Sequence, residues 1–463
     1  MNKTNHDKDC RKLTKLPENS SESKDKVAGH SHEKINSKQN TKGELIEKIL
    51  HRDNLNRAFK RVKSNKGSAG VDGVTTEELL KHLKENKEEI IGKIKARKYK
   101  PTPVKRVQIP KPNGKMRNLG IPTTTDRVIQ QAITQVLSPI YEKKFSKNSY
   151  GFRPNRSAHD ALGRIKEIAD EGYTWVVDLD LEKFFDTVNQ SKLIQILSEE
   201  IKDGDLISLI HKFLKAGVME NGLKIESEKG VPQGGPLSPL LANIYLNEAD
   251  QEFEKWDYKF VRYADDMLIF AKNKKAAERY YKRVKKYLEG NLKLKVNEEK
   301  TSIRKLNDTK YLGYGFYQDE GTQFKAHKDS LRKFKTKLKE ITGRRNGLSY
   351  EQRKIKLNQV IRGWIQYFKL ANMGNAIKNL DGWLRRRIRM CAWKNWKTLK
   401  TKFTNLRKLG IEKGKAWEWA NTRKSYWRVA GSPILNRALN NKRIADRGYL
   451  SLVNYYEKVR IKL

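Results

Sequence analysis

The sequence predicts an α+β protein in which short antiparallel strands precede a long helical C-terminal region. Three observations support this prediction. A proline-bounded Asn-Gly turn within residues 101–122 lies between runs rich in β-branched residues, which is the pattern of a hairpin. Two apolar runs flank a pair of aspartates within residues 259–271, as in a second hairpin. Elsewhere apolar residues recur at helical spacing, and beyond about residue 332 the strand signals stop.

The charge balance of the 463 residues predicts the class of partner. The chain has 99 Lys+Arg against 54 Asp+Glu, a formal net charge of +45, which favours nucleic acid first and an anionic membrane surface second. We find no apolar run of the roughly 18 residues that a membrane helix needs and no signal peptide, so we expect a soluble intracellular protein. Two cysteines, Cys10 and Cys391, argue against a disulfide framework and a cysteine-type zinc site.

The elements follow in order from the N-terminus. Residues 1–42 are polar and charged, which predicts a disordered basic leader. Residues 43–100 predict helices interrupted by the glycines of SAGVDGVT. The hairpin of residues 101–122 comes next, and residues 126–145 return to a helical pattern.

The middle of the chain alternates strands with helices. TWVVDLDLEKFFD, residues 174–186, predicts an apolar strand that runs into the start of a helix. Residues 193–217 predict helix, and the Gly/Pro loop at 230–236 precedes another long helix. The hairpin at 259–271, a lysine-rich helix and the strand-like YLGYGFY, residues 311–317, complete this part.

The C-terminal region is strongly basic. Residues 332–463 carry 35 Lys+Arg and 7 Asp+Glu, together with seven of the nine tryptophans. Arginine is densest in the run LRRRIR, where Arg385, Arg386, Arg387 and Arg389 are too many for ordinary surface solvation. Binding of a phosphate backbone fits them better. Aromatic residues interleaved with Lys and Arg also suit stacking on unpaired bases.

Two adjacent carboxylates, Asp265 and Asp266, interrupt the second hairpin. Charges in an apolar setting neutralise, pair or bind a cation, so the pair lies either in a solvated turn or in a metal site. The strand within residues 174–180 supplies Asp178 and Asp180, which strand alternation places on one face. If this strand pairs beside the hairpin, the carboxylates converge into a cluster suited to Mg²⁺. Spacing alone does not choose between Asp178 and Asp180.

Four motifs together resemble the group II intron-encoded reverse transcriptase/maturases: DLDLEKFFD, GVPQGGPLSPLLANI, FVRYADD and YLGYGF. The resemblance runs from about residue 50 to the end of the sequence. It implies a right-hand polymerase with fingers and palm, residues 101–320, built on an antiparallel sheet flanked by helices, with residues 43–100 as an N-terminal helical extension. An all-α thumb or maturase-specific domain, residues 330–400, and a basic DNA-binding extension, residues 401–463, would follow.

The resemblance also assigns roles to residues. It selects Asp180 with Asp265 and Asp266 as the catalytic carboxylates that bind two Mg²⁺ ions, with Mn²⁺ as a substitute. Two such ions would hold the attacking and departing oxygens of a phosphoryl transfer. YLGYGF matches the segment that steadies the primer end.

Five further residues are assigned to the incoming dNTP. Phe185 would exclude a 2′-hydroxyl, although core packing also explains an aromatic ring there. Gln233 would lie against the nucleotide in a loop whose glycines permit close approach, although PQGG by itself predicts only a tight turn. Lys111 and Arg117, at a hairpin tip that also holds Lys115, would bind the triphosphate rather than only water. Lys300 would protonate pyrophosphate, and a solvated surface lysine is the alternative.

The implied partners are the intron RNA, an RNA template paired with a DNA primer, the target DNA and dNTPs, with no membrane. The sequence has no C-x-x-C pair, so it resembles the endonuclease-lacking branch, and we expect a cytoplasmic protein associated with RNA and the nucleoid. The function implied is RNA-directed DNA synthesis with assistance to splicing and retrohoming. The alternatives are a splicing-only maturase with a decayed polymerase site, and a retron-like or defence reverse transcriptase.

Overall fold

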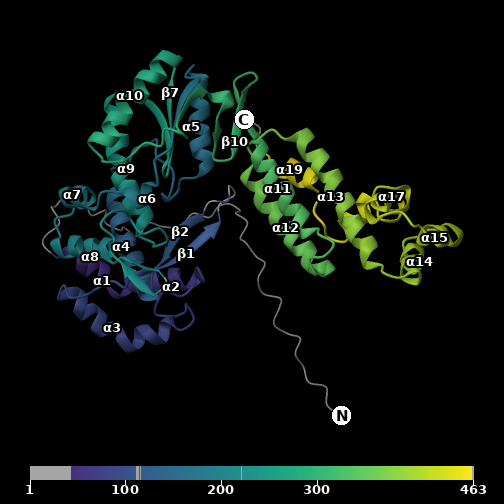
Figure 1. Ribbon diagram of the computed structural model, residues 1–463, viewed down its shortest axis with the longest axis horizontal. Coiled ribbons are helices and arrows are strands. Elements are labelled where there is room, and N and C mark those ends of the chain that lie inside the picture. The colour runs from purple at the N-terminus through teal and green to yellow at the C-terminus, as the bar shows by residue number, and fades with distance from the viewer. Residues whose placement is uncertain (1–42, 111–113, 115, 221, 461–463) are drawn as a thin grey trace, which may run out of the picture. The chain divides into compact units, whose positions relative to one another are not determined.

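The computed structural model describes residues 43–110, 114, 116–220 and 222–460 (Figure 1). The predicted leader, residues 1–42, lies outside the described residues. Within the described part the chain is a mixed α/β protein with antiparallel sheets, followed from residue 328 by helices alone. The predicted fold class is therefore confirmed at this level.

Four helices build the N-terminal part of the first hydrophobic core. They are α1 (Glu44–Leu50), α2 (Arg52–Ser64), α3 (Leu79–Lys95) and α4 (Thr124–Glu142). Ile49, Ala58 and Ile133 have no exposed surface and belong to this core. The helical prediction for residues 43–100 is confirmed, with its break between α2 and α3 at the predicted glycines.

The first sheet contains the predicted N-terminal hairpin. Its strands follow the order β2-β1-β4-β5, with bounds β1 (Val104–Pro110), β2 (Met116–Ile121), β4 (Val218–Glu220) and β5 (Leu223–Ile225). β1 pairs antiparallel with β2 and parallel with β4. Strands from two distant segments thus share one sheet.

The central sheet has the order β6-β7-β3-β8 and is antiparallel throughout. Its strands are β3 (Trp175–Leu179), β6 (Lys259–Tyr263), β7 (Asp266–Ala271) and β8 (Ser302–Lys305). The second predicted hairpin is β6–β7. The aspartate-bearing strand β3 lies directly beside it.

Six helices surround or extend the central sheet. They are α5 (Ala158–Asp170), α6 (Phe184–Thr187), α7 (Gln190–Glu200), α8 (Gly204–Lys215), α9 (Ser238–Lys255) and α10 (Lys274–Gly290). The helical pattern predicted over residues 193–217 is two helices, because the buried Asp203 caps the start of α8. Its Oδ1 accepts hydrogen bonds from the backbone N–H groups of Asp205 and Leu206 at 3.1 Å.

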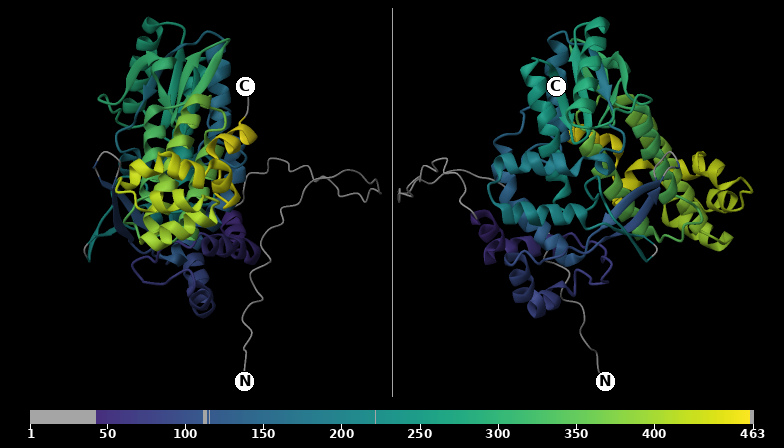
Figure 2. Two further views of the ribbon diagram at one scale, coloured as in Figure 1. Left: turned by 90° about the vertical axis from the view of Figure 1, so that its right-hand side faces the viewer. Right: turned by 60° about the vertical axis from the view of Figure 1, so that its left-hand side comes forward.

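The two faces of the central sheet belong to different cores, as strand alternation requires (Figures 1 and 2). Val177 and Ile269 pack into the first core with Val284 of α10. Val176 and Phe270 pack into the second core with helix α5 and with the helices that follow the sheets. Both faces are covered, which is why β3 and β7 are almost continuously apolar.

A small third sheet links the central sheet to the helical region. It contains β9 (Lys310–Tyr311), β10 (Tyr314–Gln318) and β11 (Thr322–Ala326), reached through the 3₁₀ turn Leu306–Asp308. Helices α11 (Lys328–Ile341), α12 (Tyr350–Tyr367) and α13 (Gly374–Asn395) then complete the second core.

The last helices form a third core and then return to the second. The third core contains α14 (Leu399–Lys408), α15 (Lys413–Ala420), α16 (Tyr426–Ala430) and α17 (Pro433–Ala438), packed around Trp393. Helices α18 (Asn441–Asp446) and α19 (Leu452–Val459) contribute to the second core instead. No helix in the described part of the chain is long and apolar enough to cross a membrane.

Candidate active site

The aspartates singled out in the sequence lie where β3 meets the β6–β7 hairpin. β3 pairs with β7 up to Leu179 and Met267, so the next step in this register sets Asp180 beside Asp266. Tyr263 pairs with Asp266, which leaves Ala264 and Asp265 as the turn. The expected pairing of the strand with the hairpin is confirmed.

Asp178 and Asp180 have different surroundings. Asp178 lies within the sheet, between Leu268 of β7 and Ser302 of β8, and its carboxylate is 3.7 Å from the Arg304 guanidinium. Burial, with the like charge of Asp180, raises the pKa of Asp178, while Arg304 opposes the shift. Asp180 follows the last paired residue of β3, and its side chain is 33% exposed against 31% for Asp178. By register Asp180 is the nearer of the two to the turn that holds Asp265, and its selection over Asp178 as a metal ligand stays a prediction.

Lys300 lies against Asp180. Its Nζ donates a hydrogen bond to Asp180 Oδ2 at 2.9 Å. The backbone explains this placement, because the N–H of Asn297 donates to the Asp180 carbonyl at 2.8 Å and Leu181 bridges to Val296. The lysine side chain is exposed, so its ammonium can move away from the carboxylate at small cost.

The carboxylates influence one another electrostatically. Desolvation by surrounding protein atoms, together with the charges of Asp265, Asp178 and Asp180, raises the pKa of Asp266 to about 6. Lys300 opposes this shift. Neighbouring carboxylates of like charge are stabilised by a cation that binds between them.

The donor set fits a hard divalent cation. Mg²⁺ prefers carboxylate oxygens and takes one or two from protein, with water and phosphate as its other ligands. Over residues 43–460, apart from the few undescribed positions, no three His, Cys, Asp or Glu side chains are gathered into a ready-made cation site. The carboxylates near Asp266 are therefore ligands of the type that Mg²⁺ prefers, but they do not form a complete coordination shell.

A buried ion pair supports the aspartate turn. Arg262 of β6 and Asp250 of α9 have no exposed side-chain surface, and Arg262 Nε donates to both carboxylate oxygens of Asp250 at 2.8 and 3.0 Å. The guanidinium Nη1 also donates to the Ala264 carbonyl at 3.0 Å and to Asn243 Oδ1 at 2.8 Å. One side chain thus ties the turn to α9.

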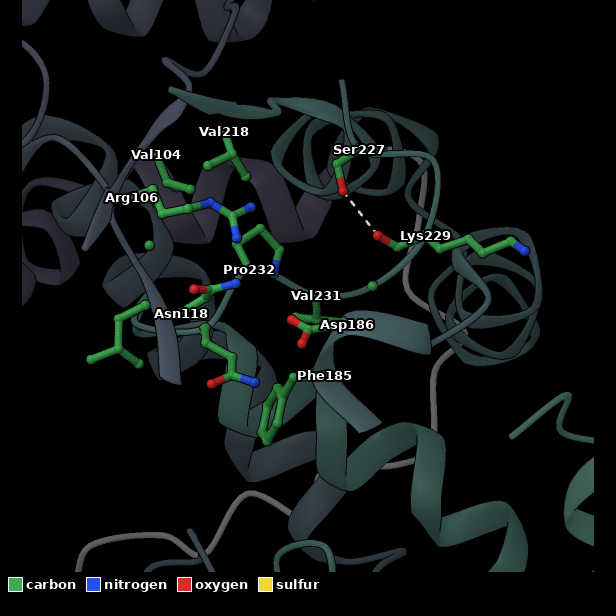
Figure 3. Close-up of a pocket in the computed structure, with 14 residues that line it drawn as sticks. Val104, Arg106, Asn118, Phe185, Asp186, Val218, Ser227, Lys229, Val231 and Pro232 are labelled. Carbon is green, nitrogen blue, oxygen red and sulfur yellow. Dashed lines mark hydrogen bonds between the residues drawn. The ribbon is translucent and has the colours of Figure 1, made fainter. Parts of the chain in front are cut away.

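A cavity of about 240 Å³ lies between the β1–β2 hairpin and the loop before α9. Phe185 and Gln233 both line it, together with Arg106, Asn118 and Asp186. Figure 3 shows Phe185, Asn118 and Arg106 around the same space. Phe185 is half-buried and packs edge-on against Phe184, with ring centroids 5.2 Å apart. Its ring therefore contacts the core and borders the cavity at once.

Glycines bring the walls of this cavity together. The N–H of Gly120 donates to the Gln233 carbonyl at 2.7 Å. A Cβ at Gly234, whose φ is 119°, would lie 2.3 Å from the Gly120 carbonyl oxygen. As expected, the glycines after Gln233 permit close approach of another group. In the described residues, the group that approaches Gly234 is the backbone of Gly120.

The hairpin tip is described only in part. Arg117 is exposed on β2 opposite Ile109. Lys111 and Lys115 lie outside the described residues. The expected pairing of Lys111 with Arg117 at a triphosphate therefore stays a prediction.

Comparisons with known proteins identify the family. Residues 109–316 match the family described as "Reverse transcriptase (RNA-dependent DNA polymerase)", and residues 331–410 match "Group II intron, maturase-specific domain". Protein YkfC of Escherichia coli (strain K12) is 36% identical over 304 residues, which cover 57% of this chain and 80% of that protein. Group II intron-encoded protein LtrA of Lactococcus lactis subsp. cremoris is 38% identical over 307 residues. The chain belongs to the group II intron-encoded reverse transcriptase/maturases.

The matches cover the relatives unequally. The alignment with LtrA spans 64% of this chain and 51% of LtrA, so the chain corresponds to about half of that relative. "Putative COX1/OXI3 intron 1 protein" of Saccharomyces cerevisiae is 28% identical over 432 residues, 80% of this chain and 49% of that protein. The chain is an RNA-directed DNA polymerase with a maturase-specific region, and the three aspartates fall in the polymerase part.

The four arginines of the run LRRRIR, in the maturase-specific region, make hydrogen bonds and ring contacts with other segments of this reverse transcriptase. Arg385 is 5% exposed and donates to Asp381 Oδ2 at 2.9 Å, and Arg389 is 8% exposed and donates to the Leu439 carbonyl at 2.7 Å. Arg386 lies over the Trp427 ring at 4.0 Å, and Arg387 donates to the Thr342 carbonyl at 2.8 Å. These contacts hold α13 to its neighbours and bury Arg385 and Arg389, whereas Arg386 and Arg387 are partly exposed, and phosphate binding by the run stays a prediction.

Sequence reasoning missed several residues of the site. The arginine of FVRYADD was visible, but its partner Asp250 lies in a separate helix and carries no motif of its own. Asn118 and Arg106 reach the Phe185 cavity only because β1 and β2 pair beside it. Hairpin alternation could have indicated Asn118, but nothing in the sequence specified which loop the hairpin contacts.

We predict that Arg262→Lys impairs catalysis more than its effect on stability explains. Lysine cannot bond Asp250 at two points and also reach Asn243 and Ala264. The unmet partners should lower the free energy of unfolding by about 1–3 kcal/mol, and displacement of the turn should reduce kcat by roughly 100-fold. Urea denaturation and primer extension would measure both. Arg164→Lys, on the outer side of α5, should change neither, and unchanged kcat in Arg262→Lys would show that the turn does not depend on this side chain.

We predict that Arg385→Gln destabilises the fold without changing the salt dependence of RNA binding. Removing the cation leaves the buried Asp381 without its counter-ion, although the N–H of Leu452 still donates to its Oδ1 at 2.8 Å. Loss of one partner of a buried ion pair costs about 3–5 kcal/mol. The exposed Arg362 on α12 provides the control, since Arg362→Gln should leave the unfolding free energy within about 0.5 kcal/mol. A flatter slope of log affinity against log salt for folded Arg385→Gln would instead indicate a phosphate contact.

Proposed function

We propose that the chain copies RNA into DNA by two-metal nucleotidyl transfer at Asp180, Asp265 and Asp266. The observation that carries this proposal is the register of β3 with β7, which sets Asp180 beside Asp266 at the end of the sheet, next to the turn that holds Asp265. Two Mg²⁺ ions held there, with Mn²⁺ as a substitute, would polarise the attacking and departing oxygens.

Lys300 fits a role in the departure of pyrophosphate. Its ammonium donates to Asp180 Oδ2 at 2.9 Å, and a cation bound by Asp180 would compete with that contact. The freed lysine would then be able to donate a proton to the leaving pyrophosphate. Arg117, with Lys111, would bind the triphosphate from the hairpin tip.

The 240 Å³ cavity fits the incoming dNTP. Phe185 would lie against the sugar and exclude a 2′-hydroxyl, and Gln233 would contact the nucleotide from the opposite loop. The support for this proposal is that two residues distant in sequence, each expected to contact the nucleotide, line one cavity. Phe185 also packs on Phe184, so the ring is held in a fixed position beside that space.

The remaining parts fit a right-hand polymerase with an RNA-binding extension. Residues 101–320 would form fingers and palm, residues 330–400 the thumb and maturase-specific domain, and residues 401–463 a region that contacts target DNA. Binding of the intron RNA through the basic helical region would assist splicing and retrohoming. A cytoplasmic location with this RNA stays a prediction.

Asp265→Asn should abolish DNA synthesis and leave RNA binding intact. The substitution keeps the shape of the turn but removes a charged oxygen donor, so we expect kcat to fall by more than about 1000-fold, the scale of losing a charge-stabilising group. Primer extension on an RNA template and filter binding of the same RNA would separate the two effects. Asp257→Asn, at an exposed position before β6, is the matched control. Undiminished synthesis by Asp265→Asn would remove Asp265 from the catalytic site.

Phe185→Ala should relax the choice between dNTPs and NTPs. Loss of the ring opens space beside the sugar, so we expect the ratio of kcat/KM for dNTP over NTP to fall by about 10- to 100-fold, the range for one steric contact. Single-nucleotide extension with dATP and ATP would give the ratio. Phe213→Leu removes a buried aromatic ring from the same core at a position that does not line the cavity, and it serves as the control. An unchanged ratio in Phe185→Ala would assign Phe185 to core packing alone.

A further inference from the structure

A second cavity adjoins the nucleotide cavity along the same loop. It has a volume of about 720 Å³ and is lined by the end of α2, by α4 and by residues 152–154. Pro232 and Gln233 line the first cavity, whereas Gly234, Gly235 and Pro236 line the second. The two spaces therefore share one loop as a common wall. Nothing in the proposed chemistry of the dNTP uses the second space.

Phe152 borders this cavity with an exposed side chain and an uncommon backbone conformation. The side chain is 58% exposed, and its φ of 60° is a left-handed conformation that bulky residues rarely adopt. A ring that is more than half exposed gains little stability from burial, so packing does not explain a phenylalanine at this position. Strained backbone of this kind concentrates at sites that bind ligands.

The position of Phe152 is fixed from the catalytic side. A Cβ at the preceding residue, Gly151, would lie 2.3 Å from the Ala264 nitrogen, so this backbone contacts the aspartate turn directly. Asn243 Nδ2 donates to the Gly151 carbonyl at 2.8 Å. On the other side, the buried Arg153 donates to the Ser149 carbonyl and to Glu142. The exposed ring is thus held at a set place relative to Asp265.

Among the arginines that line the cavity, Arg61 is available to a ligand. Arg127 donates inward to the Pro122 carbonyl at 3.1 Å, and Arg153 is bonded as described. Arg61 is exposed, and no hydrogen bond or ion pair to its guanidinium occurs among the residues that the structure describes. Asn65, the residue that follows the end of α2, adds an exposed side-chain amide.

We propose that Phe152 and Arg61 bind the single-stranded RNA template just ahead of the base being copied. The Phe152 ring stacks on an unpaired base, and Arg61 contacts a backbone phosphate. Stacking on an aromatic ring accepts every base, which a copying enzyme requires. The inference rests on the proposed polymerase function, because it places the template beside the nucleotide cavity.

The test uses binding without catalysis. The probes are an RNA/DNA hybrid with a 5′ RNA overhang and the same hybrid with a blunt end, each labelled for fluorescence anisotropy, without Mg²⁺ or dNTPs. Phe152→Gly removes the ring and also relieves the left-handed backbone. We expect roughly 5- to 100-fold weaker binding of the overhang probe, the range for one stacked base, with unchanged binding of the blunt probe. The melting temperature should equal or exceed that of the wild type.

Matched variants separate stacking from backbone effects. Asp257→Gly relieves another left-handed residue, φ 53°, at an exposed site, and it should leave both probes unaffected. Phe152→Trp should retain overhang binding, and Arg61→Gln should weaken it and lower its salt dependence. Equal binding of the overhang by Phe152→Gly and wild type would overturn the proposal. So would an equal loss on the blunt probe, which would indicate a duplex contact.

Failure of the proposed function gives a different result. If the wild-type protein extends no primer in Mg²⁺ and dNTPs, two-metal synthesis at the aspartates is wrong, and the overhang measurement still reports on Phe152 and Arg61.

Discussion

The aspartate-bearing end of the central sheet depends on the ion pair of Arg262 with Asp250. A buried guanidinium and carboxylate lose their hydration and are tolerated only with good geometry and every remaining group bonded. Here the arginine completes its bonds with the Asn243 side chain and the Ala264 carbonyl. The cost of desolvating the pair is therefore offset only when the aspartate turn is in place. The packing of α9 on β6 and the position of Asp265 therefore depend on the same side chain, Arg262.

The strand register contributes the other half of the site. The hairpin, the aspartate-bearing strand and the Gly/Pro loop were all predictable, because alternation and turn residues specify them locally. The sequence also indicated that Asp178 and Asp180 share a face. It could not choose between them, because that choice depends on where β3 stops pairing. In the structure Asp178 lies between two strands, near Arg304, whereas Asp180 follows the last pair of β3 with β7, and the choice between them as metal ligands stays a prediction.

The arginine run shows where composition misleads. Lys and Arg counts measure charge but carry no information on partners, so Arg385 to Arg389 resembled a surface for phosphate. Arg385 in fact follows Asp381 by one helical turn, a spacing that was visible in the sequence. The partners of Arg389 and Arg387, in contrast, are backbone carbonyls of distant segments. Only the tertiary packing could specify them, and the same holds for the residues that line the Phe185 cavity.

The path of the C-terminal helices has a consequence for how the chain can vary. The polypeptide leaves the second core at the end of α13, builds the third core, and comes back with α18 and α19. The return is firm, since the Tyr456 hydroxyl donates to the Ala371 carbonyl and accepts from the N–H of Met373. Topologically, α14 to α17 are an insertion within a domain and not an appended tail. A change in the length or sequence of α14 to α17 can therefore leave the packing of α18 and α19 in the second core intact.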